Sequence, residues 1–314
     1  MNHTIKKGDM ILFFAGDTWL SKSISYLTGS EVTHAAMVYS GDSIIEILSD
    51  GVQVNKIAVR DDESKGKKAY VMRHRPELDY GPLKRSADAY LNAGISYDFP
   101  GLYLLGALLI YNRFVPVPGF VKCTELILEL AVRQLDHFIQ KQIRHNPGKA
   151  MVCSQFIYQL FYDCGGEYRI PIVDGCFSVK NKEDGCSQKK ICLAELLKES
   201  AVDTADENLS VEKAEEQAPL SGAVTEDIIE NAARELYLSL TDTGWEEENG
   251  SLLSGPENLD KVCFLAGQFQ DRVKRLRKKL RADFPLDAMF VTVADLAGHA
   301  PSLERVDTVY IERL

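Results

Sequence analysis

Short apolar runs separated by turn residues dominate the first quarter of the chain, and such runs predict buried strands. The predicted strands are Asp9–Ala15, Thr33–Tyr39, Ser43–Leu48, Gly51–Val54 and Ala69–His74. Gly41 and Asp42 stand between the second and third of these runs, so those two strands should pair as an antiparallel hairpin.

Apolar residues at helical spacing mark most of the remaining segments. The predicted helices are Thr18–Leu27, Leu83–Leu91, Thr124–His137, Met151–Tyr162, Glu226–Leu240 and Leu259–Ala282. One further strand-like run, Met289–Val293, follows the last of them. Because strands come early and helices late, the pattern predicts an α+β fold in which a small antiparallel sheet packs against helices.

A change in composition divides the chain. Residues 199–216 place acidic side chains among Ala, Ser and Thr with few large apolar residues, which is typical of a solvated linker. We therefore predict a core over residues 1–195, an acidic linker and helical insertion over residues 196–283, and a segment over residues 284–314 that returns to the core. The return is expected because the apolar run Met289–Val293 finds nothing to bury against in the basic helix before it.

Composition and charge narrow the class of protein. With 314 residues, 45% apolar and 26% charged, the chain has the balance of a globular protein with a substantial core. The net charge of -10 argues against a nucleic-acid partner. The stretch Met10–Ala15 is too short for a signal sequence. Polar residues and prolines interrupt the longer run Phe99–Val121, and its continuous part, Gly101–Tyr111, is too short to cross a bilayer. We therefore expect a cytoplasmic protein.

Cys153 is the strongest candidate for chemistry. It stands in Met151-Val152-Cys153-Ser154-Gln155-Phe156, at the start of a predicted helix and shortly after Lys149. Unpaired N–H groups and the positive end of the helix dipole favour a thiolate there, and a thiolate is the nucleophile of thiol hydrolases. The alternative is a small buried hydrophobe, which is what most cysteines are.

His34 and Glu46 are the candidate partners of this thiol. His34 begins a strand of small and apolar residues, where an imidazole can take the thiol proton and later return it to a leaving group. Glu46 is the only charged residue in Ser43–Leu48, and across the predicted hairpin it can approach His34 and orient its ring. The alternatives are a packed or solvent-edge histidine and a glutamate that faces solvent.

Together these residues resemble a known family. The matching pieces are Gly8–Phe13, Val32–Val38, Glu46, Gly94–Asp98 and Val152–Ile157. They are similar to the permuted papain-like amidases of the NlpC superfamily, the YiiX/YaeF-like group, in which a histidine comes first, an acidic residue second and the cysteine last. Val291–Leu296 with Pro301–Leu303 resembles the closing segment of that superfamily. The resemblance covers about residues 5–175 and 285–314, and the stretch between them has no counterpart in it.

The resemblance implies a circularly permuted papain-like fold with a helical insertion. It also implies a cysteine hydrolase that cleaves an amide bond, in a peptide or cell-wall peptide, through a thioacyl-enzyme. Cys153 would attack, His34 would act as base and acid, and Glu46 would orient His34. Tyr97 and Asp98 fall where the family's Tyr-Asp lines the cleft, which implies contact with the substrate. The lecithin–retinol acyltransferase branch also places His before Cys, so an acyltransferase or lipid hydrolase acting on an acyl lipid is an alternative. A non-catalytic binding module on the same fold is another.

Neither a metal nor a cofactor is expected. Cys164, Cys176, Cys186 and Cys192 form no CxxC pair and have no histidine among them, which argues against a zinc site. No Gly-rich phosphate loop or dinucleotide fingerprint occurs. The basic amphipathic segment Arg272–Arg281 can bind an anionic membrane surface, although such segments are more often solvated or paired with an acidic stretch.

Overall fold

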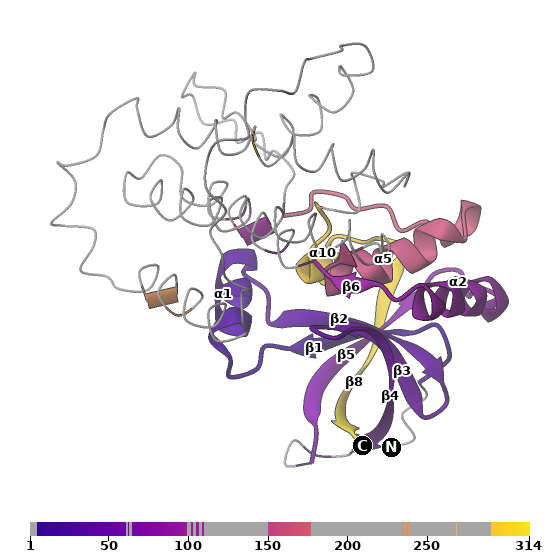
Figure 1. Ribbon diagram of the computed structural model, residues 1–314, viewed down its shortest axis with the longest axis horizontal. Helices are drawn as coiled ribbons and strands as arrows, with labels where there is room; N and C mark the ends of the chain where they lie inside the picture. Colours follow the sequence, from indigo (N-terminus) through magenta and orange to yellow (C-terminus); the bar gives the residue numbers. More distant parts are fainter. Residues whose placement is uncertain are drawn as a thin grey trace, which may run out of the picture.

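A closed six-stranded β-barrel forms the centre of the described structure, and helices lie against it (Figure 1). The structure is a computed structural model that describes residues 5–60, 62, 65–98, 150–176 and 290–314. It also describes the single positions 102, 105, 106, 109, 234, 237, 238 and 268.

The barrel strands run antiparallel to their neighbours in the order β1-β2-β3-β4-β8-β5. They are β1 (Met10–Phe14), β2 (Val32–Ser40), β3 (Ser43–Leu48), β4 (Gly51–Arg60), β5 (Lys67–His74) and β8 (Leu303–Arg313). A separate two-stranded parallel sheet joins β6 (Ser96–Tyr97) to β7 (Ala150–Met151). The α+β prediction and the hairpin of β2 and β3 are confirmed, and β4 extends well beyond the predicted Gly51–Val54.

Alternation along the strands sorts the apolar side chains into two cores, because successive residues of a strand point to opposite faces. The inner core is a cluster of ten buried residues within the barrel: Ile11, Phe13, Ala36, Val38, Ile44, Ile57, Ala69, Val71, Val309 and Ile311. The other faces of the same strands, including Leu12, Met37 and Ile45, pack against the helices outside the barrel. The barrel therefore has a filled interior and one apolar outer wall.

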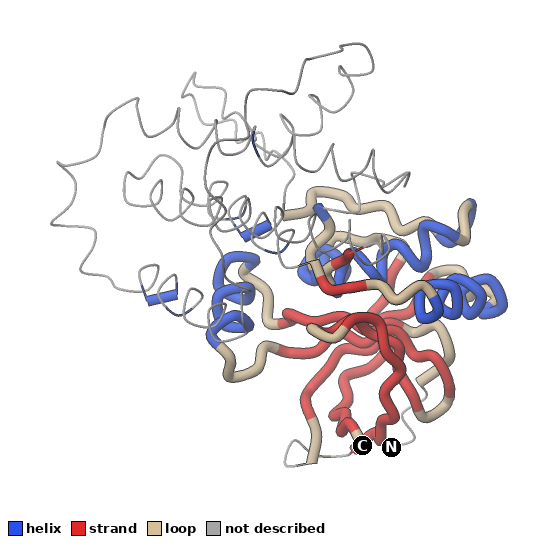
Figure 2. Tube along the Cα trace, viewed as in Figure 1, coloured by secondary structure: helices blue, strands red, loops and turns tan. Residues whose placement is uncertain are grey.

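Four α-helices are described: α1 (Trp19–Thr28), α2 (Tyr80–Asn92), α5 (Cys153–Asp163) and α10 (Val293–Gly298). In Figure 2, α2, α5 and α10 lie together against the barrel, whereas α1 stands apart beside β2. The side chain of Thr18 accepts a hydrogen bond from the N–H of Ser21 at the start of α1. Gly29 ends this helix in the left-handed conformation.

Helix α5 is the most deeply buried of the four. Every residue from Cys153 to Ile157 is buried, and Leu160 and Phe161 continue the contact with the outer wall of the barrel. The helix packs on β2 and β3. Because so much of its surface is enclosed, its first residue is held in a fixed place against these two strands.

The segment that follows residue 289 departs from the prediction. Of the predicted strand Met289–Val293, the described residues Phe290–Val293 form no strand, because Thr292 and Asp295 form a capping box that begins α10 at Val293. The strand that joins the barrel is β8, and it lies between β4 and β5. Local capping outweighs the β-branched composition of the run, whose residues Val291 and Val293 still contribute to the outer core.

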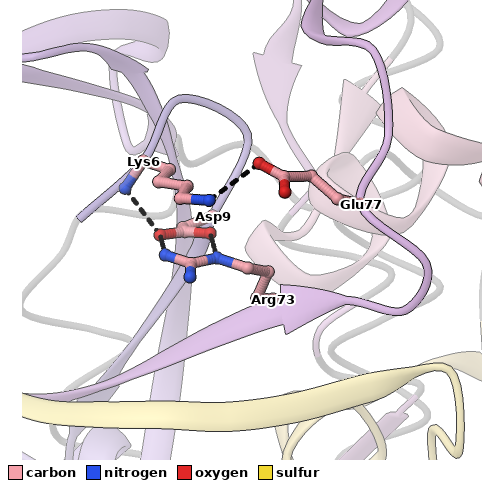
Figure 3. Close-up of polar contacts among 4 residues, drawn as sticks. All are labelled: Lys6, Asp9, Arg73 and Glu77. Atoms are coloured by element: carbon pink, nitrogen blue, oxygen red, sulfur yellow. Dashed lines mark hydrogen bonds and ion pairs between the residues drawn. The ribbon is translucent and has the colours of Figure 1, made fainter. Parts of the chain in front are cut away.

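A buried ion pair fastens β1 to β5 (Figure 3). Asp9 is 2% exposed, and Arg73 donates to both of its carboxylate oxygens over distances of 2.7 Å. The backbone N–H of Lys6 donates to the same carboxylate, and the Lys6 ammonium reaches Glu77 on the surface. Paired and hydrogen-bonded in this way, the buried charge of Asp9 is compatible with the fold.

Several predicted features lie outside the described residues, apart from single positions. They are the run Phe99–Val121, the helices Thr124–His137, Glu226–Leu240 and Leu259–Ala282, the acidic stretch 199–216 and the basic segment Arg272–Arg281. Within the part of the chain that the structure describes, no helix is both long enough and apolar enough to cross a membrane.

Candidate active site

His34 points toward the barrel interior near one end of β2. It has the same strand parity as Ala36 and Val38, which belong to the inner core, and it pairs with Phe13 of β1. The pairing of β1 and β2 shifts register directly after Phe13, and the Phe13 ring lies 5.8 Å from the imidazole. The side chain of His34 is 21% exposed, so the ring is packed on one face and accessible on another.

Glu46 is fully buried, with four hydrogen bonds to its carboxylate. On the inner face of β3 it lies diagonally across the hairpin from His34, and the Nε2–H of His34 donates to its Oε2 over 2.7 Å. Asn55 of β4 donates to Oε1 over 2.8 Å. Arg313 of β8 donates to Oε1 over 2.9 Å and to Oε2 over 2.6 Å. The solvent-facing alternative for Glu46 is therefore wrong.

These contacts fix the charge of Glu46. Burial alone raises the pKa of this carboxyl, but the hydrogen bonds from His34 and Arg313 and the charges of both residues outweigh it and lower the pKa to about 2. The carboxylate is ionised at any physiological pH.

Cys153 is the first residue of α5 and lies against His34. The preceding Val152 makes no side-chain cap, so the first turn of the helix has no competing acceptor from that side chain. Burial raises the pKa of the thiol, but the charge and hydrogen bond of His34, together with hydrogen bonds from the backbone of Ala35 and Ser154, outweigh it and lower the pKa. Since the Nε2–H of His34 is engaged by Glu46, Nδ1 is the ring nitrogen left for the sulfur.

The imidazole responds to the same neighbours in the opposite direction. Burial lowers the pKa of His34, but the thiolate of Cys153 and the carboxylate of Glu46 raise it to about 9. A lowered thiol pKa and a raised imidazole pKa together describe a thiolate–imidazolium pair over the pH range between the two. The structure thus brings all three sequence-predicted residues together.

Tyr97 ends β6, which pairs with β7 just before α5, and it interacts electrostatically with Cys153, while Asp98 follows it. The N–H of Asp98 donates to the carbonyl of Met151 over 2.9 Å, next to the residue at which the helix is capped. Burial and the charges of Cys153 and Asp98 raise the pKa of Tyr97 well above its usual range. Tyr97 therefore keeps a neutral hydroxyl and interacts electrostatically with Cys153.

Gly51 permits the close approach of the segment Ile95–Asp98 to the barrel. The N–H of Val52 donates to the carbonyl of Ile95, and a Cβ on Gly51 would lie 2.4 Å from that carbonyl oxygen. Gly51 also has a φ of +105°, which side chains rarely adopt. The start of β4 thus sets the distance between the barrel and Tyr97.

Two residues of the site are missing from the sequence-based prediction. Asn55 and Arg313 complete the shell of Glu46, and alternation with the inner-core residues Ile57 and Ile311 places both of them on the inner face. That alternation is the only signal they carry in the sequence. The alternation predicts which face of the strand a side chain occupies but not which residue it contacts, because no local sequence feature relates Arg313 to Glu46.

No protein-family model matches the chain, and no curated protein matches it.

The described residues contain no group of three or more His, Cys, Asp or Glu side chains that could hold a metal ion. Cys164 donates to the carbonyl of Leu160 within its own helix. Burial and the charge of Asp295 raise the pKa of Cys176 to about 12, which makes it a poor nucleophile. Cys186 and Cys192 lie outside the described residues. Of the three described cysteines, Cys153 is the one with a lowered pKa.

Proposed function

We propose that the chain is a cysteine hydrolase with a permuted papain-like arrangement, and that it cleaves an amide bond of a peptide. The observation that carries the proposal is the arrangement of three side chains: Cys153 at the start of α5 is hydrogen-bonded to His34, and Glu46 holds the other side of that imidazole over 2.7 Å. The lowered pKa of the thiol agrees with this arrangement. The order His34, Glu46, Cys153 along the chain supports the permuted arrangement.

The reaction follows from the protonation states of the pair. The Cys153 thiolate attacks the substrate carbonyl carbon, and the negative charge moves to the carbonyl oxygen. Cys153 occupies the first helical position, where no carbonyl of the same helix accepts its backbone N–H, so this group is available to that oxygen. In this proposal the neutral hydroxyl of Tyr97, which interacts electrostatically with Cys153, is the second donor to that oxygen.

Proton transfer then belongs to His34. The imidazolium gives its Nδ1 proton to the leaving amine, which departs and leaves a thioester on Cys153. The neutral imidazole next takes a proton from water, and the resulting attack releases the acid and restores the thiolate–imidazolium pair. Throughout both steps Glu46 accepts from Nε2, which keeps Nδ1 directed at the reacting atoms.

The nucleophile that attacks the thioester decides between hydrolysis and acyl transfer. Attack by water on the thioester gives hydrolysis, and attack by an alcohol or amine gives the acyltransferase reaction of the lecithin–retinol acyltransferase type. Both share the first half-reaction. The experiment must therefore observe the acyl-enzyme as well as its products.

A substrate panel on the full chain tests the proposal. Peptide amides and acyl esters are incubated with the wild type and with Cys153→Ala, and with Cys164→Ala as a matched control at the C-terminal cap of the same helix. We expect turnover in the wild type and the control, an acyl adduct on Cys153 by intact mass, and a loss of at least about a thousandfold in Cys153→Ala. Absence of turnover for both substrate classes, or turnover that survives in Cys153→Ala, would overturn the proposal.

A further inference from the structure

Arg313 provides two of the four hydrogen bonds that reach the Glu46 carboxylate. Its guanidinium is bidentate: Nε reaches one oxygen and a terminal nitrogen the other, which is the strongest geometry for this pair. The guanidinium also lies over the ring of Phe13, with its central carbon 4.9 Å from the ring centroid. The Phe13 ring also contacts the His34 ring, so one aromatic side chain packs against both the guanidinium of Arg313 and the imidazole of His34.

We infer that Arg313 is a positioning residue of the active site, which acts on His34 through the Glu46 carboxylate. This inference rests on the proposed function. A carboxylate with no exposed surface cannot be held by solvent, so its orientation depends on the donors around it. Asn55 fixes one oxygen from β4, and Arg313 fixes the plane of the whole group from β8. The oxygen that His34 uses is one that Arg313 also holds.

The position of Arg313 explains why β8 belongs to the catalytic unit. Arg313 is paired with Ile57 of β4 in the ladder that closes the barrel. Closure of the barrel therefore places the guanidinium on the inner face, within hydrogen-bond distance of Glu46 on β3. A role through Glu46 differs from a general contribution to folding in one respect: it disappears when Glu46 no longer carries a charge.

Among the residues that the structure describes, the charged and titratable groups that face Glu46 are His34 from β2 and Arg313 from β8, with Cys153 of α5 behind the imidazole. Since both the hydrogen bond and the charge of Arg313 lower the pKa of Glu46, their removal must raise it from about 2. Arg60 offers a matched control. It lies on β4 and pairs with Glu312 of β8 on the outside of the same strand pair, away from Glu46.

The test compares Arg313→Gln, Arg313→Lys and Arg60→Gln in the full chain, each in the wild-type and the Glu46→Gln background. Two quantities are measured: the titration of the Glu46 carboxyl carbon by NMR, assigned from its loss in Glu46→Gln, and the rate at which iodoacetamide alkylates Cys153 at pH 7. A thermal melt accompanies each variant.

We expect Arg313→Gln to raise the Glu46 midpoint and to slow alkylation by between about twofold and a hundredfold, the range of coupling within one hydrogen-bond network. Arg313→Lys keeps the positive charge but not the bidentate hydrogen bonds, so its Glu46 midpoint and alkylation rate should lie between those of the wild type and Arg313→Gln. Arg60→Gln should match the wild type. In the Glu46→Gln background the effect of Arg313→Gln on alkylation should vanish.

Two results would overturn the inference: an unchanged Glu46 midpoint and alkylation rate in Arg313→Gln, or the same slowing in both backgrounds. If Arg313→Gln does not fold, Arg313→Lys provides both readouts. A wild type that alkylates Cys153 no faster than Cys164 would instead count against the proposed function, while the NMR titration still tests the contact between Arg313 and Glu46.

Discussion

Replacement of His34 by Ala is the most direct test of the thiolate–imidazolium pair. The variant removes the charge and the hydrogen bond through which His34 lowers the pKa of Cys153. Burial of the thiol remains, and the backbone hydrogen bonds from Ala35 and Ser154 still oppose it. The pKa of Cys153 must therefore rise.

Two opposing effects set the magnitude. Each unit by which the pKa of the thiol rises above 7 lowers its ionised fraction at pH 7 about tenfold. The thiolate of higher pKa is intrinsically more nucleophilic, and with a Brønsted slope near 0.5 this returns about threefold of each tenfold loss. The net expectation for His34→Ala is a slower alkylation at pH 7, by about threefold for each unit by which the pKa of Cys153 rises above 7. The difference from the wild type should shrink as the pH rises.

The assay is the rate of iodoacetamide alkylation from pH 5 to 10, followed on the peptide that contains Cys153. His299→Ala is the control, because His299 lies at the end of α10 and contacts the carbonyl of Val173. Its profile should match that of the wild type. Superimposable profiles for His34→Ala and the wild type, with both proteins folded by thermal melt, would refute the existence of the pair.

Three further predictions concern stability. The Glu46 carboxyl has a pKa of about 2 in the folded protein against 4.5 for the free group. Its ionisation therefore stabilises the fold fully above pH 4.5, and this stabilisation is lost as the pH falls toward 2. Denaturant titrations over this range should show that the free energy of unfolding of the wild type falls by about 3 kcal/mol, a loss that is absent in Glu46→Gln. Gly51→Ala should lower the free energy of unfolding by about 1–3 kcal/mol through its clash and positive φ, whereas Gly41→Ala, with nothing within 4 Å of the new Cβ, should be nearly neutral. Asp9→Ala leaves the guanidinium of Arg73 without its buried partner and should cost about 3–5 kcal/mol, measured by chemical denaturation; a loss below about 1 kcal/mol would show that the pair is solvated.

The local part of the site could be predicted from the sequence. A tight turn at Gly41 and Asp42 makes β2 and β3 neighbours, so the approach of Glu46 to His34 follows from strand parity alone. The start of α5 at Cys153 follows from the apolar run after Val152. These contacts depend on residues close together in the chain or on one element boundary.

The long-range part could not be predicted, for two physical reasons. The first is that β8 carries charged residues on both of its faces, Glu312 on the outer and Arg313 on the inner one, so its apolar alternation is clear only around Val309 and Ile311. The second is that Met289–Val293 has the composition of a strand, while the Thr292–Asp295 capping box begins a helix there. Composition alone therefore placed the joining strand in the wrong segment.

Closure of the barrel resolves how so compact a site arises from distant segments. The hairpin of β2 and β3 supplies the imidazole and the carboxylate, but a carboxylate buried with a single donor would be unstable. Only when β8 enters between β4 and β5 does Arg313 reach that carboxylate. On the outer wall, α5 brings Cys153 to the same strand, where Ala35 provides a backbone hydrogen bond beside the ring of His34. The buried charge of Glu46 is therefore stabilised by enough hydrogen-bond donors only in the closed barrel. The orientation of the imidazole depends in turn on the whole sheet rather than on the hairpin that carries it.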